Sequence, residues 1–314
     1  MVTVECLAAL DHLFWLRTGA RAAEVLRCNQ STISRHARVC QDLFGVAFFK
    51  HSAEWCVQGD DALLNAERRV HQAYRWSRNL PLRLDAQHWV AAHCENLDLP
   101  LWRKGNLNYL GYEQPLALIK NRILDAWLCS SPDHPRDPEL CALPLCTMPA
   151  YLVVKQGHPL LGLRSPRFSD VKAYPLLPLP AHAFPVFEAM LSSLGLGGAH
   201  VHSSDDAGAG QGAPAAVEDL LVGIASPLTL QLYGPDWVVL PLQLPLAFGD
   251  VLVVRGEYAL HPRTRGLVDA LLCRVADRAR AHDAVKLLDP YAGSALPDPS
   301  GLMSPVGAPD EVVI

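Results

Sequence analysis

The chain has 314 residues, 50% of them apolar and 19% charged, with a formal net charge of −5. This length indicates about two domains, and the composition excludes a fully disordered, collagen-like or fibrous protein. We expect no membrane span, because no run of about 18 uncharged apolar residues occurs.

Two further features of the sequence indicate a cytoplasmic chain. The apolar segment 1–16 contains Glu5 and Asp11 but no Lys or Arg, whereas a secretory signal begins with basic residues. The nine cysteines are an odd number and are scattered, which is typical of reduced thiols.

Positive charge is concentrated near the N-terminus. Residues 1–80 carry a net charge of +2, and the remaining residues carry −7. Between Glu24 and Asp42 there is no acidic residue, while three arginines lie in that interval. A local excess of this kind favours phosphate binding, although a solvated helix face is the more common explanation of a basic cluster.

Three short helices are predicted at the N-terminus. Apolar residues at helical spacing predict a helix over 4–16, and a second runs from Thr18 or Gly19 to Leu26. The break at Cys28-Asn29 precedes a third helix, for which Asn29 is a suitable N-cap.

The third helix has two different faces. Ile33, Ala37 and Cys40 recur at core spacing, whereas a polar and basic stripe faces outward. The stripe consists of Ser31, Ser34, Arg35 and Arg38. Such a stripe near a helix N-terminus is what a reader of the DNA major groove needs, since Arg and Gln reach base edges and Ser and Thr meet phosphates.

The segment after this helix favours a β-hairpin. Two β-prone runs, 46–51 and 55–57, flank a short turn. Lys50 and His51 lie at the outer edge of this wing, where they can contact a sugar–phosphate backbone.

A linker helix is predicted over 60–80, ended by Pro81. Small or apolar residues alternate at spacings of three and four along it, which indicates a seam for pairing with a second helix. A single helix that packs on its own domain is the alternative. The seam residues are Leu63, Ala66, Val70, Ala73, Ser77 and Leu80.

From residue 81 to 284, strand and helix patterns alternate, which predicts an α/β domain with a largely parallel sheet. Strands are expected at 82–84, 107–110, 123–128, 151–154, 238–240 and 251–254, and helices at 114–121, 184–194, 217–222 and 267–281. Residues 285–314 are rich in Pro, Gly and Ser and are expected to be a disordered tail.

The segment 22–49 resembles the LysR-type transcriptional regulators. The matching residues are Ala22-Ala23, Gln30-Ser31-Thr32-Ile33-Ser34, Ala37, Cys40, Phe44-Gly45 and Phe48-Phe49, at the family's offsets. Later segments are similar to the family as well, namely 124–128, 151–160 with its Gly157-His158-Pro159-Leu160, and 222–225. Gln41 stands where the family usually has Glu.

The resemblance implies an α/β fold class with a winged helix-turn-helix over 1–59, the linker or dimerisation helix over 60–80, and a C-terminal two-subdomain α/β effector domain like a periplasmic binding protein over 81–284. It implies a sequence-specific DNA-binding transcription regulator that is no enzyme. Its partners would be a dyad-symmetric DNA operator, a small-molecule effector, further copies of itself as a dimer or tetramer, and RNA polymerase, with no membrane.

Two sets of candidate site residues follow. For DNA we expect Gln30, Ser31, Thr32, Ser34, Arg35, Arg38, Lys50 and His51. For the effector we use the rule that ligands lie beyond the carboxyl ends of parallel strands. This rule selects Gln87, His88, Ser130, Ser131, His182, Ser204 and Ser226.

We expect no catalytic, metal or cofactor site. The glycines at 208–212 follow a polar segment instead of a strand, and Cys141 and Cys146 lack the spacing of zinc ligands. The alternative function is a cytoplasmic small-molecule-binding protein or enzyme with an incidental N-terminal helical domain.

Overall fold

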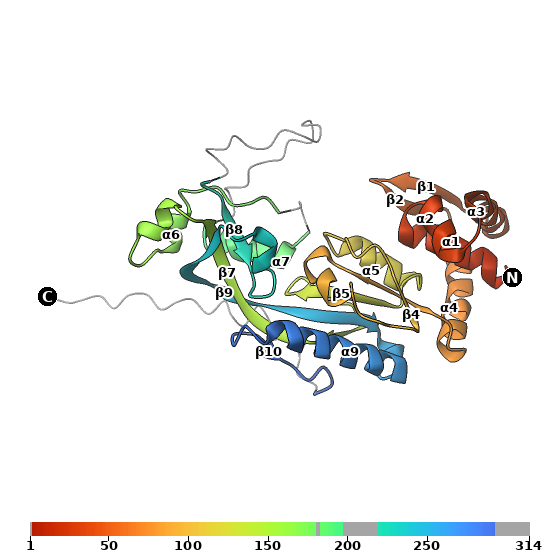
Figure 1. Ribbon diagram of the computed structural model, residues 1–314. Helices are drawn as coiled ribbons and strands as arrows, with labels where there is room; N and C mark the ends of the chain where they lie inside the picture. The colour runs from red at the N-terminus through yellow and green to blue at the C-terminus, as the bar shows by residue number, and fades with distance from the viewer. Residues whose placement is uncertain (1, 180–182, 197–218, 293–314) are drawn as a thin grey trace. The chain divides into compact units, whose positions relative to one another are not determined.

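The computed structural model describes residues 2–179, 183–196 and 219–292 (Figure 1). Within these ranges the chain packs into two compact units. The first comprises residues 2–130, 134–143 and 251–274; the second comprises 131–133, 144–179, 183–196, 219–250 and 275–292. The winged helix-turn-helix, the linker helix and the first part of the α/β domain therefore belong to one unit.

The N-terminal part of the first unit is a winged helix-turn-helix, as predicted. Its elements are α1 (Val4–Leu16), α2 (Gly19–Leu26), α3 (Gln30–Phe44), β1 (Ala47–His51) and β2 (Glu54–Gln58). The Thr3 and Thr18 hydroxyls cap α1 and α2 by accepting from the backbone N–H groups of Cys6 and Arg21. Asn29 precedes α3, but its side chain makes no capping hydrogen bond, contrary to our expectation.

Helix α1 is the centre of this part of the molecule. It packs against both α2 and α3, and ten of its 13 residues are buried. A surface helix normally buries a single apolar face. Here the polar residues Asp11 and His12 are buried as well as Trp15, so α1 is buried on more than one side. The additional buried surface lies against the α/β part of the same unit.

The linker helix α4 (Ala62–Ser77) ends one turn before Pro81. One face of it is buried within the first unit through Leu64, Arg68, Gln72 and Arg75. Arg75 Nη2 and Gln72 Nε2 donate to Asp125 Oδ1 at 3.1 and 2.9 Å. The helix is thus fixed to the α/β part by buried polar bonds.

The first unit also contains a parallel sheet. Strand β3 (Leu82–Ala86) pairs in parallel with β4 (Trp102–Lys104) on one side and with β5 (Ala126–Ser131) on the other. Strand β5 also pairs with β9 (Trp237–Arg255), and β6 (Leu140–Pro144) pairs with β9 as well. Helix α5 (Glu113–Lys120) and the short helix η1 (His88–His93) follow the expected alternation.

The second unit is built on antiparallel strands, which corrects our expectation of a largely parallel sheet there. Strand β7 (Cys146–Lys155) pairs with β8 (Val222–Ala225), with β9 (Trp237–Arg255) and with β10 (Lys286–Leu287), each time in antiparallel fashion. The helices of the second unit are η2 (Pro159–Gly162), α6 (Phe168–Val171), α7 (Pro185–Ser193) and η3 (Leu230–Tyr233). Helix η4 (Gly256–Tyr258) and most of α9 (Pro262–Ala279) belong to the first unit.

Several element boundaries differ from the sequence patterns. The run 107–110 contributes only an isolated bridge from Tyr109 to Gln87, and the strand lies earlier, at β4. Val222 belongs to β8 and not to a helix. The two runs 238–240 and 251–254 form one long strand, β9. Residues 286–287, inside the predicted tail, form β10 by pairing with β7, while residues 293–314 of that tail lie outside the described ranges.

Buried aliphatic residues hold the second unit together. Leu152, Val153 and Val154 on β7 are completely buried, and a further cluster joins Cys146, Met148, Leu228 and Val275. Among the described residues, no helix has both the length and the apolar character to cross a membrane.

Candidate DNA-binding surface and effector-binding site

Helix α3 presents its predicted polar stripe to solvent. Ile33, Ala37 and Cys40 are buried against the other N-terminal helices, so the opposite face turns outward. Five of the six predicted DNA-contacting residues of α3 are exposed, and the sixth, Thr32, is half-buried. The exposed residues are Gln30, Ser31, Ser34, Arg35 and Arg38. The helix therefore carries two arginines on an accessible surface, and its one acidic residue, the exposed Asp42, lies in the last turn.

Two details refine the predicted roles on α3. Ser34 Oγ donates to the backbone oxygen of Gln30 at 3.3 Å, which leaves its lone pairs as acceptors. Gln30 lies over the start of α2, since a Cβ added at Gly19 would be 3.1 Å from Gln30 Cγ. A residue larger than glycine at position 19 would therefore displace the Gln30 side chain.

The wing is a two-stranded hairpin. Its turn residues Ser52 and Ala53 have φ values of 48° and 68°, as a tight two-residue turn requires. Lys50 and His51 are both exposed, and Lys50 Nζ lies 5.3 Å from the centre of the Trp55 ring. Phe14 on α1 packs edge-on against Phe48 at 5.3 Å, which fastens the wing to the helices.

The linker helix exposes the predicted seam. Of the six seam residues, Leu63 and Val70 have exposed fractions of 68% and 59%, and Ala66, Ala73 and Ser77 are also exposed. The sixth, Leu80, is half-buried and lies beyond the end of α4, whereas Tyr74, outside the predicted set, is 44% exposed. Packing of the helix on its own domain is thus observed, and pairing with a second helix stays a prediction for the exposed face. One face packs within its own unit, while the seam remains available to a partner.

Two of the predicted effector residues meet at the carboxyl ends of adjacent parallel strands. Gln87 follows β3 and is completely buried, and its Oε1 accepts from the backbone N–H of Ser130 on β5 at 2.9 Å. Gln87 Nε2 is buried and has no hydrogen-bond partner among the described residues. An unpaired buried amide donor is costly, which marks this position as one where a ligand oxygen would be stabilised. His88, the next residue, is exposed.

The other predicted effector residues belong to the second unit or lie outside the described ranges. Ser131 is buried at 8% exposure. Ser226 closes a local turn, because its Oγ lies 3.1 Å from Thr229 Oγ1 and accepts from the Thr229 backbone N–H at 3.2 Å. Its hydroxyl is therefore occupied by a structural role. His182 and Ser204 lie outside the described residues.

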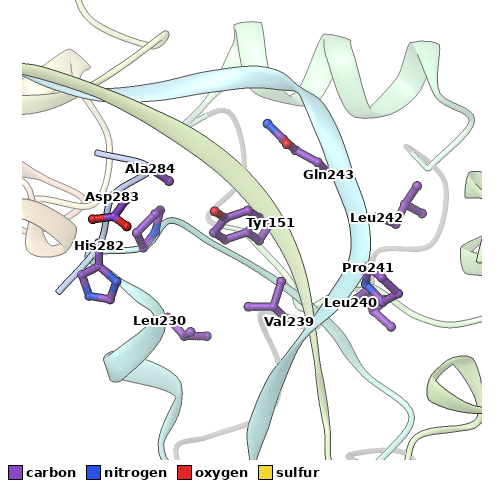
Figure 2. A pocket seen from close by; sticks show the side chains of 11 residues that line it. Tyr151, Leu230, Val239, Leu240, Pro241, Leu242, Gln243, His282, Asp283 and Ala284 are labelled. Carbon is purple, nitrogen blue, oxygen red and sulfur yellow. The ribbon is translucent and has the colours of Figure 1, made fainter. Parts of the chain in front are cut away.

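A separate pocket of about 620 Å³ lies in the second unit. Figure 2 shows its wall of Val239, Leu240 and Pro241 with Tyr151 nearby. His282 and Asp283 contribute polar atoms on another side. None of the five predicted effector residues that the structure describes lines it.

Sequence reasoning missed a group of buried polar residues at the boundary between α1 and the parallel sheet. Asp85 is completely buried, and its carboxylate accepts from Trp15 Nε1, Ala86 N and Leu107 N at 2.7, 2.9 and 2.8 Å. Burial raises the pKa of Asp85 to about 6, although these three donors act in the opposite direction. The only signal in the sequence was the presence of two charged residues, Arg83 and Asp85, in a strand whose other residues are apolar.

A second such group joins three elements. Asp11 on α1 accepts from Arg68 Nε on α4 at 2.9 Å and from Arg83 Nη1 on β3 at 3.1 Å. Burial alone would raise the pKa of Asp11, but the two guanidinium groups outweigh it and lower the pKa. Arg83 also donates to the backbone oxygen of Ile123 at 2.8 Å.

Comparison with known proteins agrees with this architecture. The family model described as LysR substrate binding domain matches residues 106–276. No protein with a curated description matches the sequence.

Two solved structures are similar in fold. One is a full-length OxyR variant from Pseudomonas aeruginosa, with 14% identity, coverage of 88% of this chain and 95% of that chain, and a TM-score of 0.56. The other is a probable transcriptional regulator from Pseudomonas aeruginosa, with 13% identity, coverage of 86% and 96%, and a TM-score of 0.52. At these identities the likeness shows the fold alone.

The family model spans more than half of the chain, and the helix-turn-helix with its wing precedes it as the resemblance implied. The chain belongs to the LysR-type transcriptional regulators, with an N-terminal winged helix-turn-helix and a C-terminal α/β substrate-binding domain.

Proposed function

We propose that the chain binds a dyad-symmetric DNA operator through α3 and the wing and changes its arrangement on DNA when a small effector binds. The observation that carries the proposal is the exposed stripe of Gln30, Ser34, Arg35 and Arg38 on a helix whose other face is buried. Gln30 and Arg35 are the candidates for base edges, while Ser34 and Arg38 are the candidates for phosphates. Thr32, Lys50 and His51 complete the surface.

Two further parts of the proposal depend on other features. The exposed seam of α4 pairs with the same seam of a second copy, which places two α3 helices on the two half-sites of the operator. The effector binds beside Gln87 and Ser130, where the unpaired Gln87 Nε2 favours a ligand with an acceptor oxygen such as a carboxylate or carbonyl. An altered contact with RNA polymerase is the consequence we expect.

The experiment is a selection of genomic DNA fragments, including the gene's own upstream region, by the purified protein at near-physiological salt. Sequence-independent phosphate binding weakens as salt rises, so a specific site must survive these conditions. We expect recovery of one dyad-symmetric sequence. Recovery of unrelated fragments with equal frequency would contradict the proposal.

Substitutions then assign the surface. Arg35→Ala should weaken operator binding by about 1–3 kcal/mol and relax the preference at one base pair of each half-site. Arg38→Ala should weaken binding to all sequences and reduce the salt dependence by about one phosphate contact per subunit. Arg280→Ala is the matched control, because Arg280 is equally exposed and lies in the second unit. Unchanged affinity of the Arg35→Ala/Arg38→Ala double variant would overturn the assignment of α3.

A further inference from the structure

Trp15, near the C-terminal end of α1, forms hydrogen bonds to the α/β part of the first unit through its indole nitrogen and its backbone oxygen. Its indole Nε1 donates to Asp85 Oδ2 at 2.7 Å, and its backbone oxygen accepts from the Tyr109 hydroxyl at 3.3 Å. The side chain is completely buried. The helix that supports the DNA-binding surface is therefore bonded directly to the effector-binding domain of the same chain.

The approach of Trp15 to Asp85 requires a glycine at position 105. A Cβ added there would collide with the Asp85 carboxylate and would lie 2.7 Å from Trp15 Nε1. The Gly105 N–H donates to the backbone oxygen of Leu84 at 2.8 Å, so the segment cannot move away while the sheet is intact. Close packing at Gly105 therefore restricts the positions that the Trp15 and Asp85 side chains can adopt.

The same segment is bonded to the residues that we assign to the effector. Gln87 forms a parallel bridge with Tyr109, and the backbone N–H of His88 donates to the backbone oxygen of Tyr109 at 2.9 Å. Asp85 and Gln87 are two positions apart along one extended segment, so their side chains leave the same side of it. A ligand that moves Gln87 or His88 therefore moves Tyr109, which contacts Trp15.

On the other side, the segment reaches the wing through Arg17. The Arg17 guanidinium lies 4.3 Å from the centre of the Tyr109 ring and donates to Asn108 Oδ1 at 3.2 Å. Its Nε lies 2.7 Å from Glu54 at the start of β2, and Trp55 Nε1 donates to the Arg17 backbone oxygen at 3.0 Å. Arg17 thus contacts both Tyr109 and the start of β2, so a displacement of Tyr109 would displace the start of β2 as well.

Resting on the function proposed above, we propose that Asp85 and Tyr109 are positioning residues through which the effector-binding segment at Gln87–His88 sets the orientation of α1 and of the wing. The connection runs within one chain. It combines one short, buried bond from Trp15 to the Asp85 carboxylate, of a kind stronger than neutral bonds, with the bond from the Tyr109 hydroxyl to the Trp15 backbone oxygen. Because coupling between two binding sites is reciprocal, operator DNA must in turn change the segment around Gln87.

Two substitutions break the Trp15–Asp85 contact and spare its surroundings. Trp15→Phe removes the indole donor and keeps an aromatic ring. Asp85→Asn retains Oδ1, which accepts from Ala86 and Leu107, but places an amide donor opposite the Trp15 donor. The matched control is Trp127→Phe, because Trp127 pairs in register with Asp85, is equally buried, and has an indole nitrogen with no hydrogen-bond partner among the described residues.

The first measurement is hydrogen exchange of the full chain without DNA. Trp15→Phe should accelerate exchange in the peptides covering 86–90 and 107–110 by about fivefold, as loss of one buried hydrogen bond does, and Trp127→Phe should not. The effects of Trp15→Phe and Asp85→Asn on exchange in α1 should be less than additive, since both remove the same bond. Additive effects, or no change around 86–90, would overturn the proposal whether or not the chain binds DNA.

The second measurement adds the operator duplex recovered by the fragment selection. In the wild type and in Trp127→Phe, DNA should change exchange over 86–90 by about fivefold or more, and in Trp15→Phe this response should disappear while the variant still binds the duplex. An equal response in Trp15→Phe would overturn the coupling and leave the DNA-binding function intact. If the wild type binds no operator, the proposed function is wrong. The DNA-free measurement then still tests whether Trp15 and Asp85 connect α1 to the segment around Gln87.

Discussion

The two units of the molecule are stabilised in different ways. In the first, three fully buried carboxylates, Asp11, Asp85 and Asp125, each accept hydrogen bonds from a different element of the chain. In the second, the core around Leu152 and Met148 is apolar, and the buried carboxylate Asp133 accepts from the backbone N–H groups of Val186 and Phe187 on α7 and not from an arginine. Apolar side chains can pack in several arrangements at a similar free energy, whereas a buried ion pair is stable only when its charged groups stay at hydrogen-bonding distance. We infer that the first unit is built to keep α1, α4 and β3 in a defined orientation.

The largest expected effect comes from Asp11→Ala. This substitution leaves Arg68 and Arg83 buried without their common partner, and uncompensated buried charges typically cost about 3–5 kcal/mol. Exchange of the α1 amides should accelerate accordingly, and exchange of the β7 amides in the second unit should remain as in the wild type. Peptide-resolved hydrogen exchange measures both regions in one experiment.

Two controls sharpen this difference between the units. Glu24→Ala removes one partner of the exposed Arg21–Glu24 pair and should change stability by at most about 0.5 kcal/mol. Leu152→Ala creates a cavity in the second unit and should cost about 2–5 kcal/mol there, with α1 unaffected. If Asp11→Ala or Leu152→Ala accelerated exchange in both units, the two units would unfold together, and the difference between them inferred above would be wrong.

A smaller effect is expected from pH, through Asp85. Its pKa is about 6 in the folded chain, above the ordinary value of 3.8, so the folded state binds this proton more tightly than the unfolded state. The buried charge therefore costs stability above pH 6, and this cost is lost as the pH falls from 6 towards 4. The difference in unfolding free energy between wild type and Asp85→Asn should shift in favour of the wild type by on the order of 2 kcal/mol between pH 7 and pH 4.

Denaturant unfolding at a series of pH values, followed for each variant under the same conditions, measures this shift. Asp133 in the second unit also has a pKa of about 6 for the same reason, so the pH dependence of the wild type alone does not isolate Asp85. Subtracting the Asp85→Asn curve removes the Asp133 contribution. A difference that stays constant with pH would mean that Asp85 titrates normally and is accessible to water.

The sequence was informative where local rules decide the structure. The spacing of Ile33, Ala37 and Cys40 predicted which face of α3 is buried, and the structure confirms it. The spacing along α4 selected residues that are indeed exposed, such as Leu63 and Val70. In both helices a single period of 3.6 residues determines which side chains meet the core.

The sequence was less informative where distant segments meet. Asp85 and Trp15 are 70 positions apart, and no local pattern indicates that their side chains form a hydrogen bond. The antiparallel pairing of β7, β8 and β9 was missed because alternating helices and strands favour a parallel sheet, while the register of a strand depends on its partners. The same reason explains why β10 was assigned to a tail.

The smallest expected effect on stability comes from Val70→Glu on the exposed seam of α4. Val70 is 59% exposed and faces away from the buried residues of its own unit, so the fold of one chain should change by less than about 0.5 kcal/mol. Self-association, in contrast, should be strongly weakened, because two seams that pair would each bury a charge. Sedimentation velocity over a range of concentrations measures this directly.

Leu260→Glu is the matched control, since Leu260 is 65% exposed and lies outside α4. Equal association of the two variants would show that copies of the chain meet through another surface, and the exposed seam would then need a different partner.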